Sequence, residues 1–166
     1  MVHFACACEK KWLPLQVILC VVRKVWINLT KRYTIMILIA DSGSTKTHWC
    51  LMAANGHSSE YFTDGINPFQ QTSDAIKNSV NNQLLPKMAG EMWAGKITNV
   101  YFYGAGCTPE KIPVVVYALE DIFKDAKIEV YSDMVGAACG LLGEEKGVAC
   151  ILGTGANSCL WNGKEI

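Results

Sequence analysis

The sequence lacks an excess of charge of either sign. Its 166 residues carry fifteen basic and fifteen acidic side chains, which give a formal net charge of zero. It also lacks a basic stripe with interleaved aromatic residues. Nothing electrostatic therefore favours a nucleic acid or an acidic membrane as the partner. With 51% hydrophobic and 18% charged residues, the composition is that of a globular protein with one sizeable core.

Cysteine pairs at metal-ligand or redox spacing are missing as well. Eight cysteines are present, but there is no CxxC pair, and only Cys6 and Cys8 lie close together. Most of the others stand singly, several in apolar runs, so we expect buried, reduced thiols in a cytoplasmic protein. The three histidines have no metal-ligand spacing. No His/Asp partner set accompanies Ser42 or Ser132, so a hydrolase triad is not indicated.

A long apolar run is also absent from the first 35 residues. The apolar stretch at 12–22 contains Pro14 and is too short to span a bilayer, and no small-residue cleavage site of a signal peptide follows it. Three interpretations of residues 1–35 stay open: a poorly structured extension, an uncleaved anchor, or residues upstream of the natural start. We favour the last, because Met36 opens the first clear strand, MILIAD.

From Met36 onward the pattern predicts an α/β domain. Three strands at 36–41, 47–53 and 58–64 form an antiparallel meander, with Asn55-Gly56 as a hairpin turn. Helices and strands then alternate, which predicts parallel strands joined by crossover helices. The expected elements are a helix that Pro86 interrupts, a strand at 97–106, a helix at 109–125, a strand at 126–133, a helix at 134–143 and a strand pair at 147–163.

Three of these strands end in small or acidic residues. They are the segments 41–47 (DSGSTKT), 132–133 (SD) and 152–157 (LGTGAN). In open α/β sheets, ligands bind at the carboxyl ends of the strands. We therefore expect the three ends to converge on one crevice.

The first of these loops has the residues of a phosphate site. Gly43 allows close backbone approach, and Ser44 and Thr45 offer hydroxyl and backbone donors. Asp41 would repel phosphate by itself, so its useful role is to hold Mg²⁺ through water. Lys46 adds a positive charge at the flank. The loop is not a P-loop, because the GxxxxGK[ST] spacing is missing, and an ordinary hairpin turn stays open as the alternative.

The second glycine-rich loop is weaker by itself. Gly153 and Gly155 permit tight backbone conformations, and Thr154 supplies a hydroxyl. A plain β-hairpin explains the same residues. Two such loops from different parts of the chain make a stronger indication than either one.

Two further residues offer polar chemistry. Asp133 follows a strand and precedes a helix, where it serves either as an N-cap or as a general base that takes a proton from a substrate hydroxyl. Asn67 offers a donor and an acceptor to a polyhydroxylated ligand, or is simply a loop amide before Pro68.

Five segments in order carry a family resemblance: ILIADSGSTKTHWCL, DGINPF, YFYGAGC, VYSDMVGAA and GVACILGTGANSCLW. Together they resemble the N-acetylglucosamine kinase-like proteins of the BadF/BadG/BcrA/BcrD-type ATPase family. That family belongs to the actin, sugar-kinase and heat-shock-chaperone superfamily, so the resemblance implies a ribonuclease-H-like, actin-like ATPase lobe with a mixed sheet. It extends from residue 36 to about residue 166.

The resemblance implies ATP and Mg²⁺ as cofactors. The loop from Asp41 to Thr47 would hold the ATP phosphates, with Asp41 binding Mg²⁺ through water. The loop from Gly153 to Asn157 would grip the phosphates from the opposite side. Phosphoryl transfer in such a site depends mainly on positioning and charge neutralisation.

The resemblance also implies a sugar site. Asp133 matches the catalytic base that acts on the sugar hydroxyl, and Asn67 matches a residue that contacts the sugar. Gly104 and Gly106 match a loop near the floor of the cleft. The expected substrate is N-acetylglucosamine or a related amino sugar.

The expected domain organisation is an extension at 1–35, an N-terminal ATPase lobe at 36–146 and the start of a truncated second lobe at 147–166. Family members have a second lobe that supplies the adenosine site, and full-length members are expected to form homodimers. The activity of this chain alone is therefore open. Two other functions also stay open: an ATPase that activates a dehydratase or reductase through an iron–sulfur cluster, with Cys139 as a superficial match, and a non-catalytic nucleotide-binding module.

Overall fold

The computed structural model describes residues 3–7, 36–54, 56–89, 97–152 and 156–166, with only the backbone of 3–7. The chain divides into two compact units. The larger unit is Tyr33–Ser132, and the smaller unit combines Met1–Arg32 with Asp133–Ile166. In the described residues, no helix is long and apolar enough to cross a membrane.

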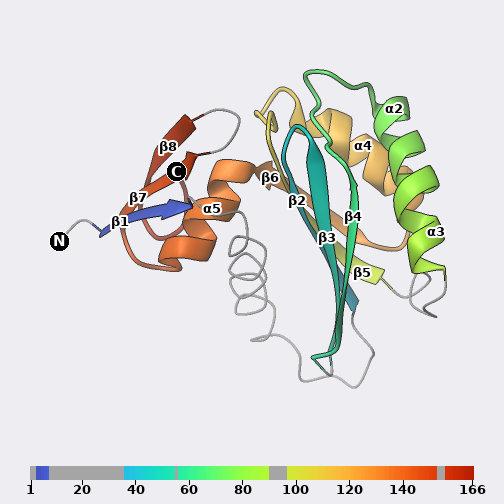
Figure 1. Ribbon diagram of the computed structural model, residues 1–166, viewed down its shortest axis with the longest axis horizontal. Helices are drawn as coiled ribbons and strands as arrows, with labels where there is room; N and C mark the ends of the chain where they lie inside the picture. Colours follow the sequence, from blue (N-terminus) through green and yellow to red (C-terminus); the bar gives the residue numbers. More distant parts are fainter. Residues whose placement is uncertain (1–2, 8–35, 55, 90–96, 153–155) are drawn as a thin grey trace. The chain divides into compact units, whose positions relative to one another are not determined.

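The larger unit is built on a five-stranded mixed sheet with the order β4-β3-β2-β5-β6 (Figure 1). β2, β3 and β4 pair antiparallel, which confirms the predicted meander. β5 pairs parallel with β2, and β6 pairs parallel with β5, as the crossover pattern predicted. The strands are β2 (Met36–Ser42), β3 (Lys46–Ala53), β4 (Ser58–Asp64), β5 (Ile97–Gly104) and β6 (Lys127–Ser132).

Two helical segments accompany this sheet. The first begins as α2 (Ser73–Ser79), continues as a π-helical turn at Val80–Leu84 and ends as α3 (Leu85–Met88). The second is α4 (Ile112–Ile122), with a proline in its first turn.

The prediction that Pro86 interrupts the first helical segment was wrong, because α3 continues to Met88. Pro86 lies in the first turn of α3. The N–H groups of a first turn make no hydrogen bond within the helix, so proline, which lacks an N–H, is tolerated there. In the preceding π turn the Leu85 N–H donates to the Val80 carbonyl, which shifts the hydrogen-bond register just before the proline.

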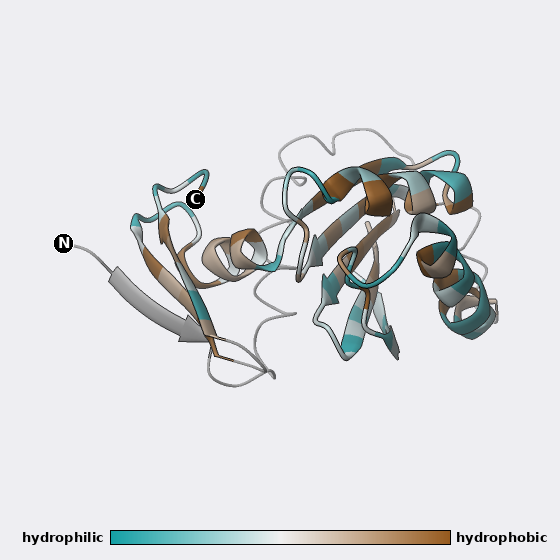
Figure 2. Ribbon diagram, turned by 90° about the horizontal axis from the view of Figure 1, so that it is seen from above, coloured by the Kyte–Doolittle hydropathy of each residue, from teal (hydrophilic) through white to brown (hydrophobic). Residues whose placement is uncertain are grey.

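The core of the larger unit lies between the sheet and these helices. Leu38, Trp49 and Phe102 face it from three adjacent strands, and Ile76 and Leu119 face it from α2 and α4; all five are buried. The helices carry hydrophobic and hydrophilic residues on different sides (Figure 2), as expected for amphipathic helices that cover a sheet.

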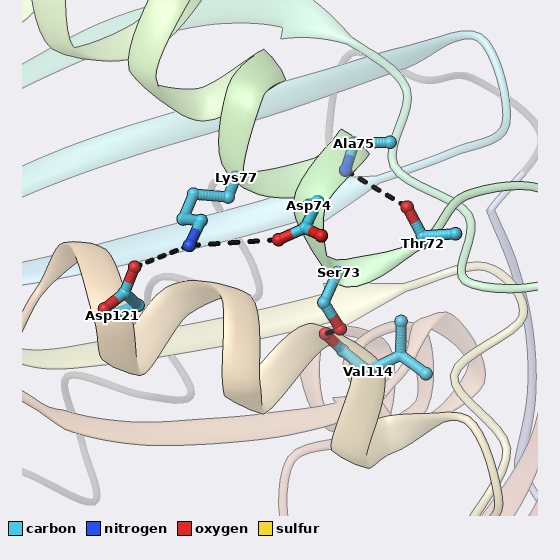
Figure 3. A network of polar contacts seen from close by, with 7 residues as sticks. All are labelled: Thr72, Ser73, Asp74, Ala75, Lys77, Val114 and Asp121. Atoms are coloured by element: carbon cyan, nitrogen blue, oxygen red, sulfur yellow. Dashed lines mark hydrogen bonds and ion pairs between the residues drawn. The ribbon is translucent and has the colours of Figure 1, made fainter.

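Polar contacts join α2 to α4 at the edge of this core (Figure 3). Thr72 caps α2, accepting from Ala75 N at 3.3 Å. Ser73 Oγ donates to the Val114 carbonyl at 2.8 Å, and Lys77 Nζ lies 2.7 Å from Asp121 Oδ2. Thr72 is therefore the N-cap of α2.

The smaller unit contains a three-stranded sheet with the order β1-β7-β8 and helix α5. β7 and β8 form the predicted antiparallel pair. β1 pairs parallel with β7, so at least this part of the 1–35 extension forms regular structure. The structure groups α5 with these strands, and the lobe boundary expected after residue 146 stays a prediction. The elements are β1 (His3–Ala7), α5 (Asp133–Leu142), β7 (Gly147–Leu152) and β8 (Ala156–Trp161).

The cysteines differ in state. Cys139 in α5 is disulfide-bonded, so the expectation of a reduced thiol was wrong at this position. A pattern of single cysteines cannot show which thiols the fold brings together. Four described cysteines are free, as expected: Cys50, Cys107, Cys150 and Cys159.

Candidate active site

The β2–β3 loop is an exposed turn at the carboxyl end of β2. Gly43 N donates to the Lys46 carbonyl at 2.9 Å, which closes the turn. Ser44, Thr45 and Lys46 are exposed. The backbone is thus a hairpin, as the simpler interpretation predicted, and its polar groups are accessible to a ligand.

A buried pair of hydroxyl groups fixes this hairpin to the chain that follows β4. Ser42 Oγ accepts from Ile66 N at 2.9 Å and lies 2.7 Å from Thr47 Oγ1. Thr47 Oγ1 also donates to the Asp64 carbonyl at 3.0 Å. Both side chains are fully buried. The observed role of Thr47 is therefore to hold the loops together, and its predicted contact with the cofactor is untested.

Ser42→Ala is expected to destabilise the chain by about 1–3 kcal/mol, because the Ile66 N–H and the Thr47 hydroxyl would lose a buried partner. Urea unfolding of the 166-residue chain measures this change. Ser58→Ala, at an exposed position on β4, is the control and should stay within about 0.5 kcal/mol of the wild type. Equal midpoints for the two variants would contradict the structural role of Ser42.

Gly65 was not predicted as a site residue, yet its backbone packs directly on the first loop. A Cβ atom at Gly65 would lie 2.5 Å from the Ser44 carbonyl oxygen and would also collide with the Gly43 carbonyl oxygen. Only glycine permits this approach of two backbones. The Asp64-Gly65 turn dipeptide was the available sequence signal, but it does not say which segment the glycine meets.

This packing brings Asn67 to the first loop. Asn67 Nδ2 donates to Ser44 Oγ at 3.4 Å, and Asn67 Oδ1 accepts from Phe69 N at 3.0 Å. Asn67 N donates to Gln71 Oε1 at 2.9 Å. The carboxamide is held in one orientation, and it keeps one N–H and one lone pair for a ligand. Asn67, the predicted sugar contact, and Ser44, a predicted phosphate contact, are thus neighbours.

The loop after β5 completes this edge of the sheet. Ala105 N donates to the Ser42 carbonyl at 2.8 Å. Gly106 has a φ of +76°, and a Cβ there would lie 2.5 Å from Asn67 Oδ1. A Cβ at Gly104 would lie 2.9 Å from Cys107 Sγ. The structure therefore places Gly106 beside Asn67, and the position near the cleft floor that the resemblance implies for Gly104 and Gly106 stays a prediction.

Asp41 and Lys46 lie on either side of the turn. Asp41 is half-buried near the end of β2, in register with His48 of β3 and Tyr103 of β5. Lys46 Nζ lies over the Phe62 ring, 4.9 Å from its centroid. The described residues contain no cluster of three or more His, Cys, Asp or Glu that could hold a metal ion. The single carboxylate of Asp41 suits a hydrated Mg²⁺, which keeps several waters and needs few protein ligands.

Asp133 begins α5 in the smaller unit. Its Oδ1 accepts from Met134 N at 2.9 Å, and the side chain is half-buried. Burial raises the pKa of the Asp133 carboxyl, and hydrogen bonds from backbone N–H groups oppose this rise. Asp133 is the first residue of α5, and this bond to the next residue is not the bond to N2 or N3 that an N-cap makes. The raised pKa makes the carboxylate a stronger proton acceptor than an ordinary aspartate, and its role as the base stays a prediction.

The second predicted phosphate loop connects β7 to β8. Gly153, Thr154 and Gly155 lie outside the described residues. Asn157 is exposed on β8, and its Oδ1 accepts from Ser158 N at 2.9 Å. Leu152 pairs with Ala156, so the loop joins two paired strands as predicted.

The chain is similar to a protein of known structure. The chain matches the crystal structure of a putative N-acetylglucosamine kinase (PG1100) from Porphyromonas gingivalis, with a TM-score of 0.72 and 51% identity. The match covers 78% of this chain and 46% of that one, so this chain spans about half the length of the relative. No protein-family model and no curated protein matches the chain.

Two more distant structures also match. A putative N-acetylglucosamine kinase from Chromobacterium violaceum has 16% identity and a TM-score of 0.47, and covers 74% of this chain and 44% of its own. YeaZ from Pseudomonas aeruginosa has 13% identity and a TM-score of 0.38, with 76% and 57% coverage.

The mixed sheet with its helices is the N-terminal lobe of the actin-like ATPase class, which confirms the predicted fold. Within this class, the 51% identity confirms the predicted resemblance of the chain to N-acetylglucosamine kinase-like proteins.

Proposed function

We propose that this chain is the N-terminal part of an ATP-dependent kinase that phosphorylates a hydroxyl group of N-acetylglucosamine or a related amino sugar. The observation that supports this most is the contact of Asn67 with Ser44, 3.4 Å between Nδ2 and Oγ. It joins the candidate sugar contact to the candidate phosphate loop. Phosphoryl transfer needs this proximity, because donor and acceptor must meet in line.

Each candidate residue has its own role in the proposed reaction. The backbone of Gly43 and the hydroxyls of Ser44 and Thr45 bind phosphate oxygens, and Asn67 orients the sugar. Asp41 would hold Mg²⁺ through water, and the ion would supply positive charge that offsets the negative charge of the phosphates. Asp133 accepts the proton of the sugar hydroxyl.

A chimera tests this function. In it, the chain replaces the matching part of the Porphyromonas gingivalis relative, which provides the rest of the protein. We expect ADP release with ATP and Mg²⁺ to rise strongly when N-acetylglucosamine is added, and less with glucose or mannose. ADP release that no sugar in an amino-sugar panel stimulates would refute the proposed substrate class.

Gly43→Ala is expected to weaken ATP binding without weakening the fold. A Cβ at Gly43 would meet only the Lys46 carbonyl oxygen, at an ordinary 3.7 Å, so the turn can accept it. A phosphate that approaches the loop backbone would meet the methyl group, and we expect an affinity loss of about tenfold or more. Calorimetric titration of the chimera with Mg²⁺-ATP measures this, and thermal unfolding is the control. Unchanged ATP affinity would show that the phosphates lie elsewhere.

A further inference from the structure

An exposed aromatic ring and a lysine lie together beside Asn67. Phe69 is 61% exposed, although large apolar side chains are usually buried. Lys111 Nζ lies over its ring, 5.3 Å from the centroid. Neither residue was predicted from the sequence as part of the site.

The backbone holds this pair in place. Phe69 N donates to Asn67 Oδ1 at 3.0 Å, and a Cβ at Gly106 would lie 3.0 Å from Phe69 Cδ2. The chain then turns from Gly106 to Lys111 through two hydrogen bonds, Thr108 N to the Gly106 carbonyl and Lys111 N to the Thr108 carbonyl, both 2.9 Å. The same glycine thus positions Asn67 and the ring that Lys111 covers.

The charge of Lys111 is not neutralised within the part of the chain that the structure describes. No ion pair involves it there. Its acidic neighbour Glu110 is engaged elsewhere, because the Thr108 side chain hydrogen-bonds the Glu110 carboxylate and holds its pKa below the usual value. Lys111 is half-buried, and its ammonium group lies over the Phe69 ring. An ammonium group without a carboxylate partner among the described residues favours an anionic ligand group.

We propose that Phe69 and Lys111 form the outer wall of the sugar site and select an amino sugar that carries an acidic substituent, a carboxylate or a phosphate. This inference rests on the proposed function, since Asn67 must contact the sugar. The ring offers an apolar face to the C–H side of the sugar. The ammonium group donates a charge-assisted hydrogen bond to the acidic substituent.

Binding to the 166-residue chain, measured by ligand-observed NMR titration, tests the proposal with three sugars. N-acetylglucosamine is the neutral probe, its 3-O-lactyl ether carries a carboxylate, and its 1-phosphate carries a phosphate. We expect one of the two acidic sugars to bind about tenfold tighter than the neutral one, and which one it is identifies the substituent. Lys111→Met should abolish this preference, so that neither acidic sugar binds tighter than N-acetylglucosamine. Lys124→Met, which removes the same charge beyond the other end of α4, should behave as the wild type.

Phe69→Leu should weaken binding of all three sugars, whereas Tyr117→Leu, at another exposed aromatic residue on α4, should not. Equal affinity for neutral and acidic sugars, or a preference that survives in Lys111→Met, overturns the inference and leaves the proposed function standing. A wild-type chain that binds none of the three sugars overturns both.

Discussion

Asp133→Asn is expected to lower the turnover number of the chimera by about 10²- to 10⁴-fold, because the asparagine cannot accept the proton of the sugar hydroxyl. Mg²⁺-ATP affinity should change little, since only the proton acceptor is lost. Steady-state kinetics and calorimetric titration measure the two quantities. Asp125→Asn, at an exposed position just after α4, is the matched control and should keep full turnover. Full turnover in Asp133→Asn would refute the base assignment.

The pH dependence gives a second readout of the same residue. Burial raises the pKa of Asp133, so the base becomes protonated, and activity falls, at a higher pH than for an ordinary aspartate. A raised pKa in the folded protein also means that the ionised carboxylate costs stability above that pKa, and that this cost disappears as the pH falls through it. Asp133→Asn should therefore be at least as stable as the wild type at neutral pH. A lower melting temperature there would indicate a structural role for the charge.

Gly65→Ala is expected to destabilise the larger unit by about 3 kcal/mol, because its methyl group would collide with backbone atoms of Gly43 and Ser44. The loops would have to separate, so the contact of Asn67 with Ser44 should be lost too. Urea unfolding measures the first effect, and sugar binding by the chimera measures the second.

The control for Gly65→Ala is Gly43→Ala in the facing loop. Its Cβ has an ordinary contact distance, so stability should change by less than about 1 kcal/mol. The two variants thus have opposite expected patterns: Gly65→Ala weakens the fold, and Gly43→Ala weakens ATP binding. A Gly65→Ala variant as stable as the wild type would contradict the observed packing of the two loops.

Much of the fold could be predicted because local signals agreed with the tertiary structure. The apolar run that opens at Met36 and the Asn-Gly turn defined the meander, and the alternation after it defined the parallel strands. Pro86 misled the prediction because a π turn places the proline where its missing N–H is harmless. The pairing of β1 with β7 joins residues more than a hundred positions apart, and no local pattern encodes such a contact.

The place of the candidate residues among the helices and strands could be predicted, but their contacts could not. The sequence put Asp41 at the end of a strand, Asn67 in a loop and Asp133 between a strand and a helix, and the structure has them there. The pattern could not tell that Thr47 points inward to Asp64, because register decides which side a strand residue faces. Nor could it find Gly65, whose role depends on its packing against Gly43 and Ser44, more than twenty residues earlier in the chain.

In the proposed reaction, the γ-phosphate of ATP passes to a sugar hydroxyl. The most direct measurement is to incubate the chimera with ATP labelled at the γ-phosphate, Mg²⁺ and N-acetylglucosamine, and to locate the label. We expect label on the sugar, at a rate that Asp133→Asn reduces by about 10²-fold or more. Label found only as inorganic phosphate would contradict it, because the protein would then be an ATPase and not a kinase.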